Sequence, residues 1–171
     1  MKFNLLNRKI HYWLSIGVAI PALIVICSGL LLQVKKQFTW VQPSEQKGKS
    51  KTAKLSMPQI LEISKTIPEA EIKDWDDINR LDVRPSRGML KVFAKNHWEI
   101  QIDAETGEIL QTAYRRSDII ESIHDGSFFH DYVKLWIFLP SGIILLILWL
   151  TGIYLFILPI WVKRKRKIAR E

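Results

Sequence analysis

The chain has 171 residues and a formal net charge of +8, from 25 lysines and arginines against 17 aspartates and glutamates. Residues 1–9 carry a net charge of +3 and residues 163–171 carry +5, so the long middle of the chain is neutral. A nucleic-acid-binding protein needs its basic residues on one face of a folded domain, and this distribution excludes that function. Neither a glycine-rich phosphate loop, nor a nucleophile elbow, nor an HExxH motif occurs, which argues against a hydrolase.

Two long runs contain no charged residue, Trp13–Leu32 and Leu135–Val162. At about 1.5 Å per residue, each run is long enough as a helix to cross a hydrocarbon core of about 30 Å. The basic tails lie outside both runs, and the positive-inside rule then places both termini in the cytoplasm. The sequence therefore predicts a membrane α-helical protein, in which two transmembrane helices flank an extracytoplasmic α+β domain of one helix and an antiparallel sheet.

The first third of the chain divides into three predicted segments. Residues 1–9 form a cytoplasmic tail, and residues 10–34 form the first transmembrane helix, with a kink at Pro21. Its apolar core is longer than that of a signal peptide and no small-x-small pattern follows, so we expect an uncleaved anchor. Residues 35–54 are polar and contain Pro43 and Gly48, which favours a flexible linker.

Residues 55–115 are expected to form the small extracytoplasmic domain. Ser56 and Gln59 have the spacing of a capping box at the start of a helix that Pro68 ends. Strands are then predicted at 89–94, 98–102 and 108–114, separated by turn-forming residues. One helix and an antiparallel sheet make a domain of the α+β class.

The last third begins with an interfacial segment, residues 116–132, which includes a short amphipathic helix ending near Ile123. Residues 133–162 form the second transmembrane helix, and residues 163–171 form a basic cytoplasmic tail. Cys27, the one cysteine, lies inside the first apolar run, so no intrachain disulfide is possible.

Three stretches together resemble the PepSY-associated transmembrane family. They are His11–Gly17, Trp98–Leu110, and Ile123–Gly126 followed by a span that contains Leu150-Thr151-Gly152. The resemblance implies a PepSY-like domain on the outer side of a cytoplasmic (inner) membrane, in a periplasm. Some larger relatives reduce ferric siderophores and bind b-type haem through histidines, which would carry a ligand role onto His11 and His124.

The histidines lie at opposite ends of the predicted spans. His11 lies at the cytoplasmic end, and His124 and His130 lie at the outer end, so His11 and an outer histidine of one subunit cannot ligate the same iron. A parallel homodimer solves this problem by symmetry, with two haem b groups shared between the subunits. The sequence leaves His130 open as the alternative to His124. The preferred function is a membrane electron-transfer protein that supports reduction of ferric chelates in iron uptake, as a component of a haem-dependent reductase.

Other interpretations remain open at this stage. The chain fits a membrane-tethered PepSY regulatory or binding module without a cofactor, with Trp75 and Trp98 at the partner surface. It also fits an accessory subunit that completes its haem sites with a larger membrane partner. Beyond haem, an exposed divalent-metal site is the weaker alternative for the outer segment, with His124, Asp125, His130 and Asp131 as its ligands.

Overall fold

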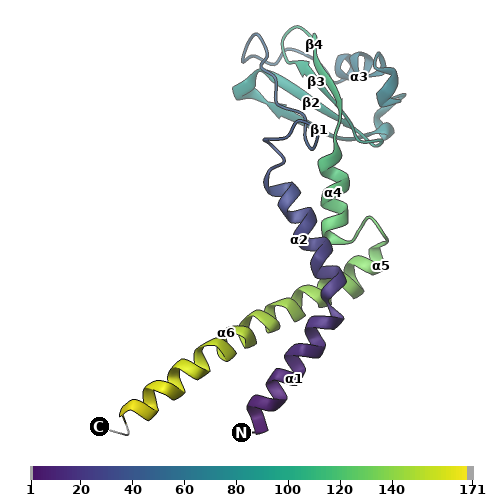
Figure 1. Cartoon of the computed structure of the whole chain (residues 1–171). Helices are drawn as coiled ribbons and strands as arrows, with labels where there is room; N and C mark the ends of the chain where they lie inside the picture. The colour runs from purple at the N-terminus through teal and green to yellow at the C-terminus, as the bar shows by residue number, and fades with distance from the viewer. Residues whose placement is uncertain (1, 169–171) are drawn as a thin grey trace. The chain divides into compact units, whose positions relative to one another are not determined.

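The structure is a computed structural model that describes residues 2–168, with side chains described for residues 5–164. The chain folds into two compact units. The helical unit contains the chain up to Gly29 and from Ser122 onward, and thus combines both ends of the colour scale in Figure 1. The sheet unit is Leu30–Glu121.

The first apolar run forms two helices, α1 (Lys2–Gly17) and α2 (Ala19–Gln33), with a bend of 63° between them at Val18. The sequence predicts one helix with its kink at Pro21, whereas the break lies one turn earlier. The reason is steric, because a proline ring clashes with the carbonyl of the residue four positions before it, which here is Gly17. Pro21 itself lies in the first turn of α2, where its missing N–H is tolerated.

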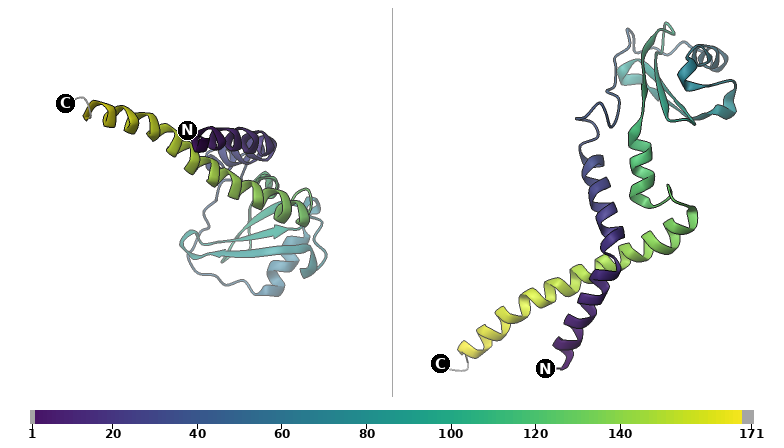
Figure 2. Two further views of the ribbon diagram at one scale, coloured as in Figure 1. Left: turned by 90° about the horizontal axis from the view of Figure 1, so that it is seen from below. Right: turned by 45° about the vertical axis from the view of Figure 1, so that its right-hand side comes forward.

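The C-terminal part of the helical unit starts at the end of α4 (Arg116–Asp125) and continues through a tight reversal. Gly126 makes this reversal with a φ of +82°, and a Cβ there would lie 2.5 Å from the Phe138 ring. After it come α5 (Asp131–Val133), one π-helical turn (Lys134–Phe138) and α6 (Leu139–Ile168). Figure 2 shows α6 crossing α1, against which it packs.

The helices carry the signature of membrane spans. Asp131–Arg164 is one continuous helix that is long and apolar enough to cross a membrane, and the bent pair of α1 and α2 passes the same test if it forms one span. Only 6% of the most apolar window of Asp131–Arg164 is buried inside the protein, so its apolar side chains are not explained by a soluble core. This part of the predicted fold class is confirmed at the level of one or two apolar helices.

The sheet unit contains the expected antiparallel sheet. Its four strands lie in the order β1 (Ile78–Arg84), β2 (Met89–Ala94), β3 (Trp98–Asp103) and β4 (Ile109–Tyr114), each antiparallel to its neighbour. One helix, α3 (Met57–Lys65), packs on one face of the sheet (Figure 1). Gln59 Oε1 accepts a hydrogen bond from the Ser56 backbone N–H at 2.9 Å, which confirms the predicted helix start.

The hydrophobic core lies between α3 and the sheet. Alternate residues of the two central strands point toward α3, because side chains along a strand alternate between faces. The buried apolar residues of this core are Ile60, Ala70, Ile72, Leu90, Val92, Ala94, Ile100, Ile102 and Ala104. Trp98 packs partly against this core, so it is less available as a partner surface than the sequence implies.

The opposite face of the sheet is covered by residues 42–50, which we call the strap. Their composition predicts a flexible linker, but they run along the sheet and bond to it. Gln101 accepts from the Gln46 backbone N–H at 2.8 Å and donates to the Ser44 carbonyl at 2.9 Å. The Lys49 backbone N–H donates to the Asp103 carboxylate at 2.7 Å. Side chains of the sheet thus form the hydrogen bonds that the backbone N–H and C=O groups of the strap require. The sequence of the strap alone does not reveal these partners.

Beneath the strap lies a chain of ion pairs. The Lys91 ammonium, 1% exposed, lies 3.2 Å from both Glu45 and Glu99. Arg115 then pairs with Glu99 at 2.9 Å and with Asp118 at 2.6 Å. Buried charges require such compensation, because an unpaired one would lose its hydration without replacement. The chain of charges links the strap, two strands and the start of α4.

Candidate functional site

His11 of α1 meets α6 through a hydroxyl group. Its Nδ1 lies 3.0 Å from Thr151 Oγ1, 140 positions along the chain. That hydroxyl also lies 2.8 Å from the Ile147 carbonyl, four residues before it in the helix. A threonine hydroxyl has one proton, and a helical carbonyl has only lone pairs to offer, so the proton goes to the carbonyl. Thr151 Oγ1 is therefore the acceptor and His11 Nδ1–H the donor.

This hydrogen-bond pattern favours one tautomer of His11. A neutral imidazole carries one proton, and with that proton on Nδ1 the lone pair is on Nε2. Metal-ligating histidines commonly donate their second ring N–H to such a partner, which orients the ring and raises the basicity of the ligating nitrogen. With this tautomer, Nε2 of His11 is unprotonated.

His124 at the end of α4 has the same arrangement with α2. Its Nδ1 lies 3.0 Å from Ser28 Oγ, and Ser28 Oγ lies 2.5 Å from the Ile24 carbonyl. The proton accounting is the same, so Nδ1–H donates to Ser28 and Nε2 keeps its lone pair. Ser28 is 5% exposed, which shields this hydrogen bond from competing solvent.

A glycine follows each hydroxyl residue and lies beside the same histidine. A Cβ on Gly29 would lie 3.3 Å from His124 Cε1, and one on Gly152 would lie 3.8 Å from His11 Cε1. Residues 27–31 (Cys-Ser-Gly-Leu-Leu) and residues 150–154 (Leu-Thr-Gly-Ile-Tyr) are weakly similar in sequence, and their contacts are similar too. Each segment presents a hydroxyl and a glycine to a histidine on another helix.

An apolar groove opens next to His124 within the helical unit. It has a volume of about 510 Å³. Its lining residues are Val25, His124, Asp125, Lys134, Leu135, Phe138, Leu139, Gly142, Ile143 and Leu146. Gly142 leaves open space here, since a Cβ on it would meet no atom within 4 Å.

The polar end of the groove carries an ion pair. Lys134 Nζ lies 2.5 Å from Asp125 Oδ2. Burial raises the pKa of Asp125, but the hydrogen bonds from Lys134 and Ser127 outweigh it and lower the pKa to about 2. Asp125 is consequently a carboxylate at neutral pH and Lys134 its counter-ion.

His130 has a different environment. It lies in an exposed turn, its Nδ1 accepts the Tyr132 backbone N–H at 3.2 Å, and its ring stacks on Tyr132. Because Nδ1 uses its lone pair there, the neutral ring carries its proton on Nε2. This is the opposite tautomer to that of His11 and His124, and His130 does not line the groove.

Two further predicted features are placed by the structure. His97 lies in the β2–β3 hairpin with a φ of +70° and contacts Tyr114 edge-on. Among the described residues, no group of three or more histidine, cysteine or acidic side chains could hold a metal ion, so His124, Asp125, His130 and Asp131 do not converge. The sequence analysis missed Ser28 and Thr151 as partners of the histidines, although their repeated pattern was visible.

Comparison with known proteins assigns the family. A family profile, described as the PepSY-associated TM region, matches residues 8–170. Neither the curated proteins nor the solved structures that were searched gave a match. The match covers both apolar regions, the sheet unit and both histidine arrangements. With nearly its whole length matched and at least one helix apolar enough to span a bilayer, the chain is a membrane protein that belongs to the PepSY-associated TM region family.

Proposed function

We propose that the chain is a b-type haem electron-transfer protein of the cytoplasmic membrane, with His11 and His124 as axial ligands. The observation that carries this proposal is the pairing of each histidine Nδ1 with a hydroxyl that already donates to its own helix. Both rings therefore keep Nε2 free for iron. Haem, when bound, supplies one-electron redox chemistry.

Two separate haem sites follow from the distance between the histidines. Seventeen residues separate His11 from Ser28, the partner of His124, and a bent helix of that length spans about 20 Å. One iron cannot take ligands from both positions. Each site accordingly needs a second ligand, and a parallel homodimer supplies the same histidine from its second copy.

The groove beside His124 fits a macrocycle held in this way. Its walls are mostly apolar and its floor is opened by Gly142, while Lys134 lies at the polar end. Lys134 is already paired with Asp125 at that end, so the support for a macrocycle comes from the apolar walls, which would exclude water from the ring. The groove is open on one side, which fits a site that a second subunit completes.

The proposed topology assigns the two haem sites to opposite sides of the membrane. The two apolar segments form two transmembrane helices with both basic termini in the cytoplasm, and the sheet unit lies outside. His11 then serves the inner haem and His124 the outer haem. Electrons pass outward to an acceptor such as a ferric chelate.

The test is a spectroscopic comparison of full-length protein purified in detergent after expression with ample haem. We expect red protein with a b-type spectrum after dithionite reduction. His11→Ala and His124→Ala should each remove part of the haem, and the double variant all of it. His97→Ala is the matched control and should leave the spectrum unchanged. Colourless protein that is folded by circular dichroism, with no co-purifying polypeptide, overturns the proposal.

One observation favours a second candidate, a tethered binding module without cofactor. The Gln101 side chain forms hydrogen bonds with two backbone groups of the strap, the Gln46 N–H and the Ser44 carbonyl. These contacts show that this face of the sheet holds an extended segment, here the chain's own strap, through backbone groups. A module of this class would purify colourless and bind a peptide partner on its sheet unit.

A further inference from the structure

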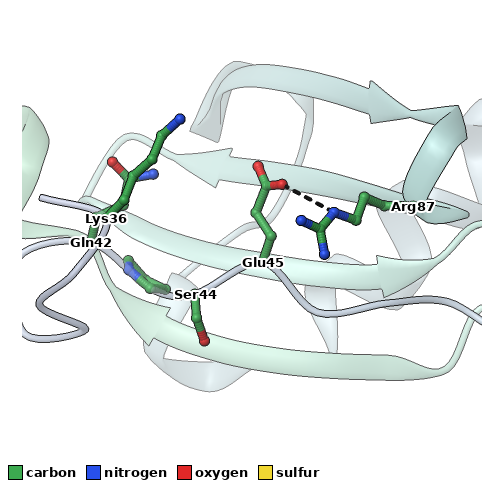
Figure 3. Close-up of a pocket in the computed structure, with 6 residues that line it drawn as sticks. Lys36, Gln42, Ser44, Glu45 and Arg87 are labelled. Carbon is green, nitrogen blue, oxygen red and sulfur yellow. Dashed lines mark ion pairs between the residues drawn. The ribbon is translucent and has the colours of Figure 1, made fainter.

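The sheet unit contains a polar cavity that the proposed electron transfer does not use. Its volume is about 340 Å³, and it is lined by Lys36, Gln42, Pro43, Ser44, Glu45 and Arg87. Figure 3 shows Lys36 and Gln42 together on one side, and Glu45 paired with Arg87 on the other. From this cavity we infer a binding site for an anionic glycerophospholipid headgroup of the phosphatidylglycerol type.

Charge is the first argument. Glu45 is the one carboxylate in the lining, and three cations lie within 4 Å of it: Lys91 at 3.2 Å, Arg87 at 3.7 Å and Arg84 at 3.9 Å. Burial raises the pKa of Glu45, but the hydrogen bond and charge of Lys91 and the charges of Arg84 and Arg87 outweigh it and lower the pKa. The lowered pKa shows that these cations stabilise the ionised form of Glu45. Because Lys91 is also paired with Glu99 and Arg84 with Asp82, the positive charge left for a bound anion comes mainly from Arg87 and from Lys36.

Lys36 adds a cation that the protein does not neutralise. Among the residues that the structure describes, no acidic side chain pairs with it, and it is exposed at the edge of the cavity. Arg87 uses only its Nε in the pair with Glu45, and it is half-exposed. The remaining guanidinium N–H groups are suited to phosphate oxygens.

An unsatisfied acceptor is the second argument. Gln42 Oε1 is buried and has no hydrogen-bond partner among the described residues. A buried acceptor without a partner costs about 1–3 kcal/mol, so it is rare unless something else supplies the donor. A phosphate diester alone has no donor, whereas a glycerol headgroup carries hydroxyl groups. The cavity thus combines positive charge for the phosphate with an acceptor for a hydroxyl.

The position along the chain identifies the membrane as the source. Lys36 comes three residues after Gln33, the last residue of the apolar helix α2. The exposed aromatic residues Phe38 and Trp40, 58% and 61% exposed, follow directly. Tryptophan is enriched at the headgroup level of membranes, where its ring contacts the acyl region and its N–H contacts water. Lys36, which lines the cavity, therefore lies within a few residues of the expected headgroup level.

The test measures lipid retained by the full-length protein in detergent by native mass spectrometry, during titration with phosphatidylglycerol or phosphatidylcholine. We expect preferential retention of phosphatidylglycerol. Lys36→Gln and Arg87→Gln should each weaken it about fivefold, which corresponds to one basic residue near an anionic surface. Lys47→Gln, which removes an exposed lysine of the strap outside the cavity, is the matched control and should change it less than twofold.

A further variant separates the hydroxyl from the charge. Gln42→Leu keeps the charges and should weaken phosphatidylglycerol without weakening phosphatidic acid, which has no headgroup hydroxyl. Equal retention of phosphatidylcholine, or equal loss in Lys47→Gln and Lys36→Gln, overturns the inference. A final competition experiment adds soluble glycerol phosphate to the lipid-bound protein. Displacement of the lipid at a comparable concentration would contradict the inference that the site takes its ligand from the membrane. Circular dichroism of each variant confirms that the fold is intact, and Lys36→Gln removes no ion pair among the side chains of residues 5–164.

Discussion

Removing the hydroxyl beside each histidine should disturb the histidine without touching it. Thr151→Val replaces the hydroxyl of Thr151 by a methyl group of similar size, and Ser28→Ala removes the hydroxyl of Ser28. Each change deletes the acceptor of an Nδ1–H that lies 3.0 Å away. Thr151→Ser and Ser28→Thr are the matched controls, because both keep the hydroxyl.

The expected magnitude follows from the hydrogen bond that is lost. A hydrogen bond of normal length contributes about 0.5–1.5 kcal/mol net, which corresponds to about a 2- to 13-fold preference for the Nδ1–H tautomer. Loss of this preference lowers the fraction of rings with a free Nε2 lone pair. Haem affinity should fall by a similar factor or up to about 100-fold, as for other changes in groups that orient metal ligands.

The assay reads the ring nitrogens directly. In the ¹⁵N NMR spectrum of full-length protein without haem, His11 and His124 should show protonated Nδ1, and His130 should show protonated Nε2. Thr151→Val should change the signal of His11 only, and Ser28→Ala that of His124 only. Protonated Nε2 at His11 or His124 in the unchanged protein would refute the tautomer argument, whatever the protein binds.

The remaining predictions concern three backbone positions of the helical unit and one buried carboxylate. In Gly152→Ala the added Cβ would lie 3.8 Å from the His11 ring, so this variant should gain up to about 1 kcal/mol of stability from the higher helix propensity of alanine. In Gly29→Ala the added Cβ would lie 3.3 Å from the His124 ring, so this variant should lose that gain and retain haem less well. Gly126→Ala should cost about 2 kcal/mol or more in thermal unfolding, since it combines a φ of +82° with a 2.5 Å ring contact. Burial raises the pKa of Asp103, but hydrogen bonds from the backbone N–H groups of the strap and of its own turn outweigh it and lower the pKa to about 2. A lowered folded-state pKa gives stability that is complete above the unfolded value near 3.8 and is lost as pH falls toward 2. The hydrogen-exchange protection factors of the β3–β4 hairpin should therefore fall about fivefold over this range, which corresponds to about 1 kcal/mol after solvent screening. Asp103→Asn should lack this pH dependence, and its persistence in that variant would contradict the assignment.

Local sequence signals predicted the sheet unit well, because its elements obey short-range rules. The strand at 89–94 is confirmed residue for residue, and the strand beginning at Trp98 ends one residue later than predicted. Turn-forming glycines such as Gly88 and Gly107 adopt the positive φ that their turns require. Strand and turn patterns depend on neighbours within a few residues, so a single sequence is enough to predict these elements.

The strap was misread because its order depends on distant partners. Its polar residues, taken alone, are typical of a linker, but the acceptor and donor that hold it belong to Gln101, and Lys91 lies beneath it. Nothing in residues 42–50 indicates that Gln101, 55 positions after Gln46, carries the matching groups. The same applies to Lys91, whose charge predicts an exposed position and whose side chain is 1% exposed.

The histidine sites were predicted only in part for a related reason. Position at the ends of apolar runs singled out His11, His124 and His130, and family resemblance favoured the first two. The hydroxyl partners lie 140 and 96 positions away, respectively, so spacing along the chain could not pair them. The predicted kink at Pro21 lies one turn after the observed bend at Val18, because a proline ring clashes with the carbonyl four residues before it.

The most direct test of the haem proposal is a native mass spectrum of the full-length protein released from detergent. The account predicts a dimer that carries two haem groups, one for each pair of symmetry-related histidines. His11→Ala and His124→Ala should each leave a dimer with one haem. A monomer without haem, from cells supplied with haem and with no second polypeptide bound, would contradict the account and favour the tethered binding module.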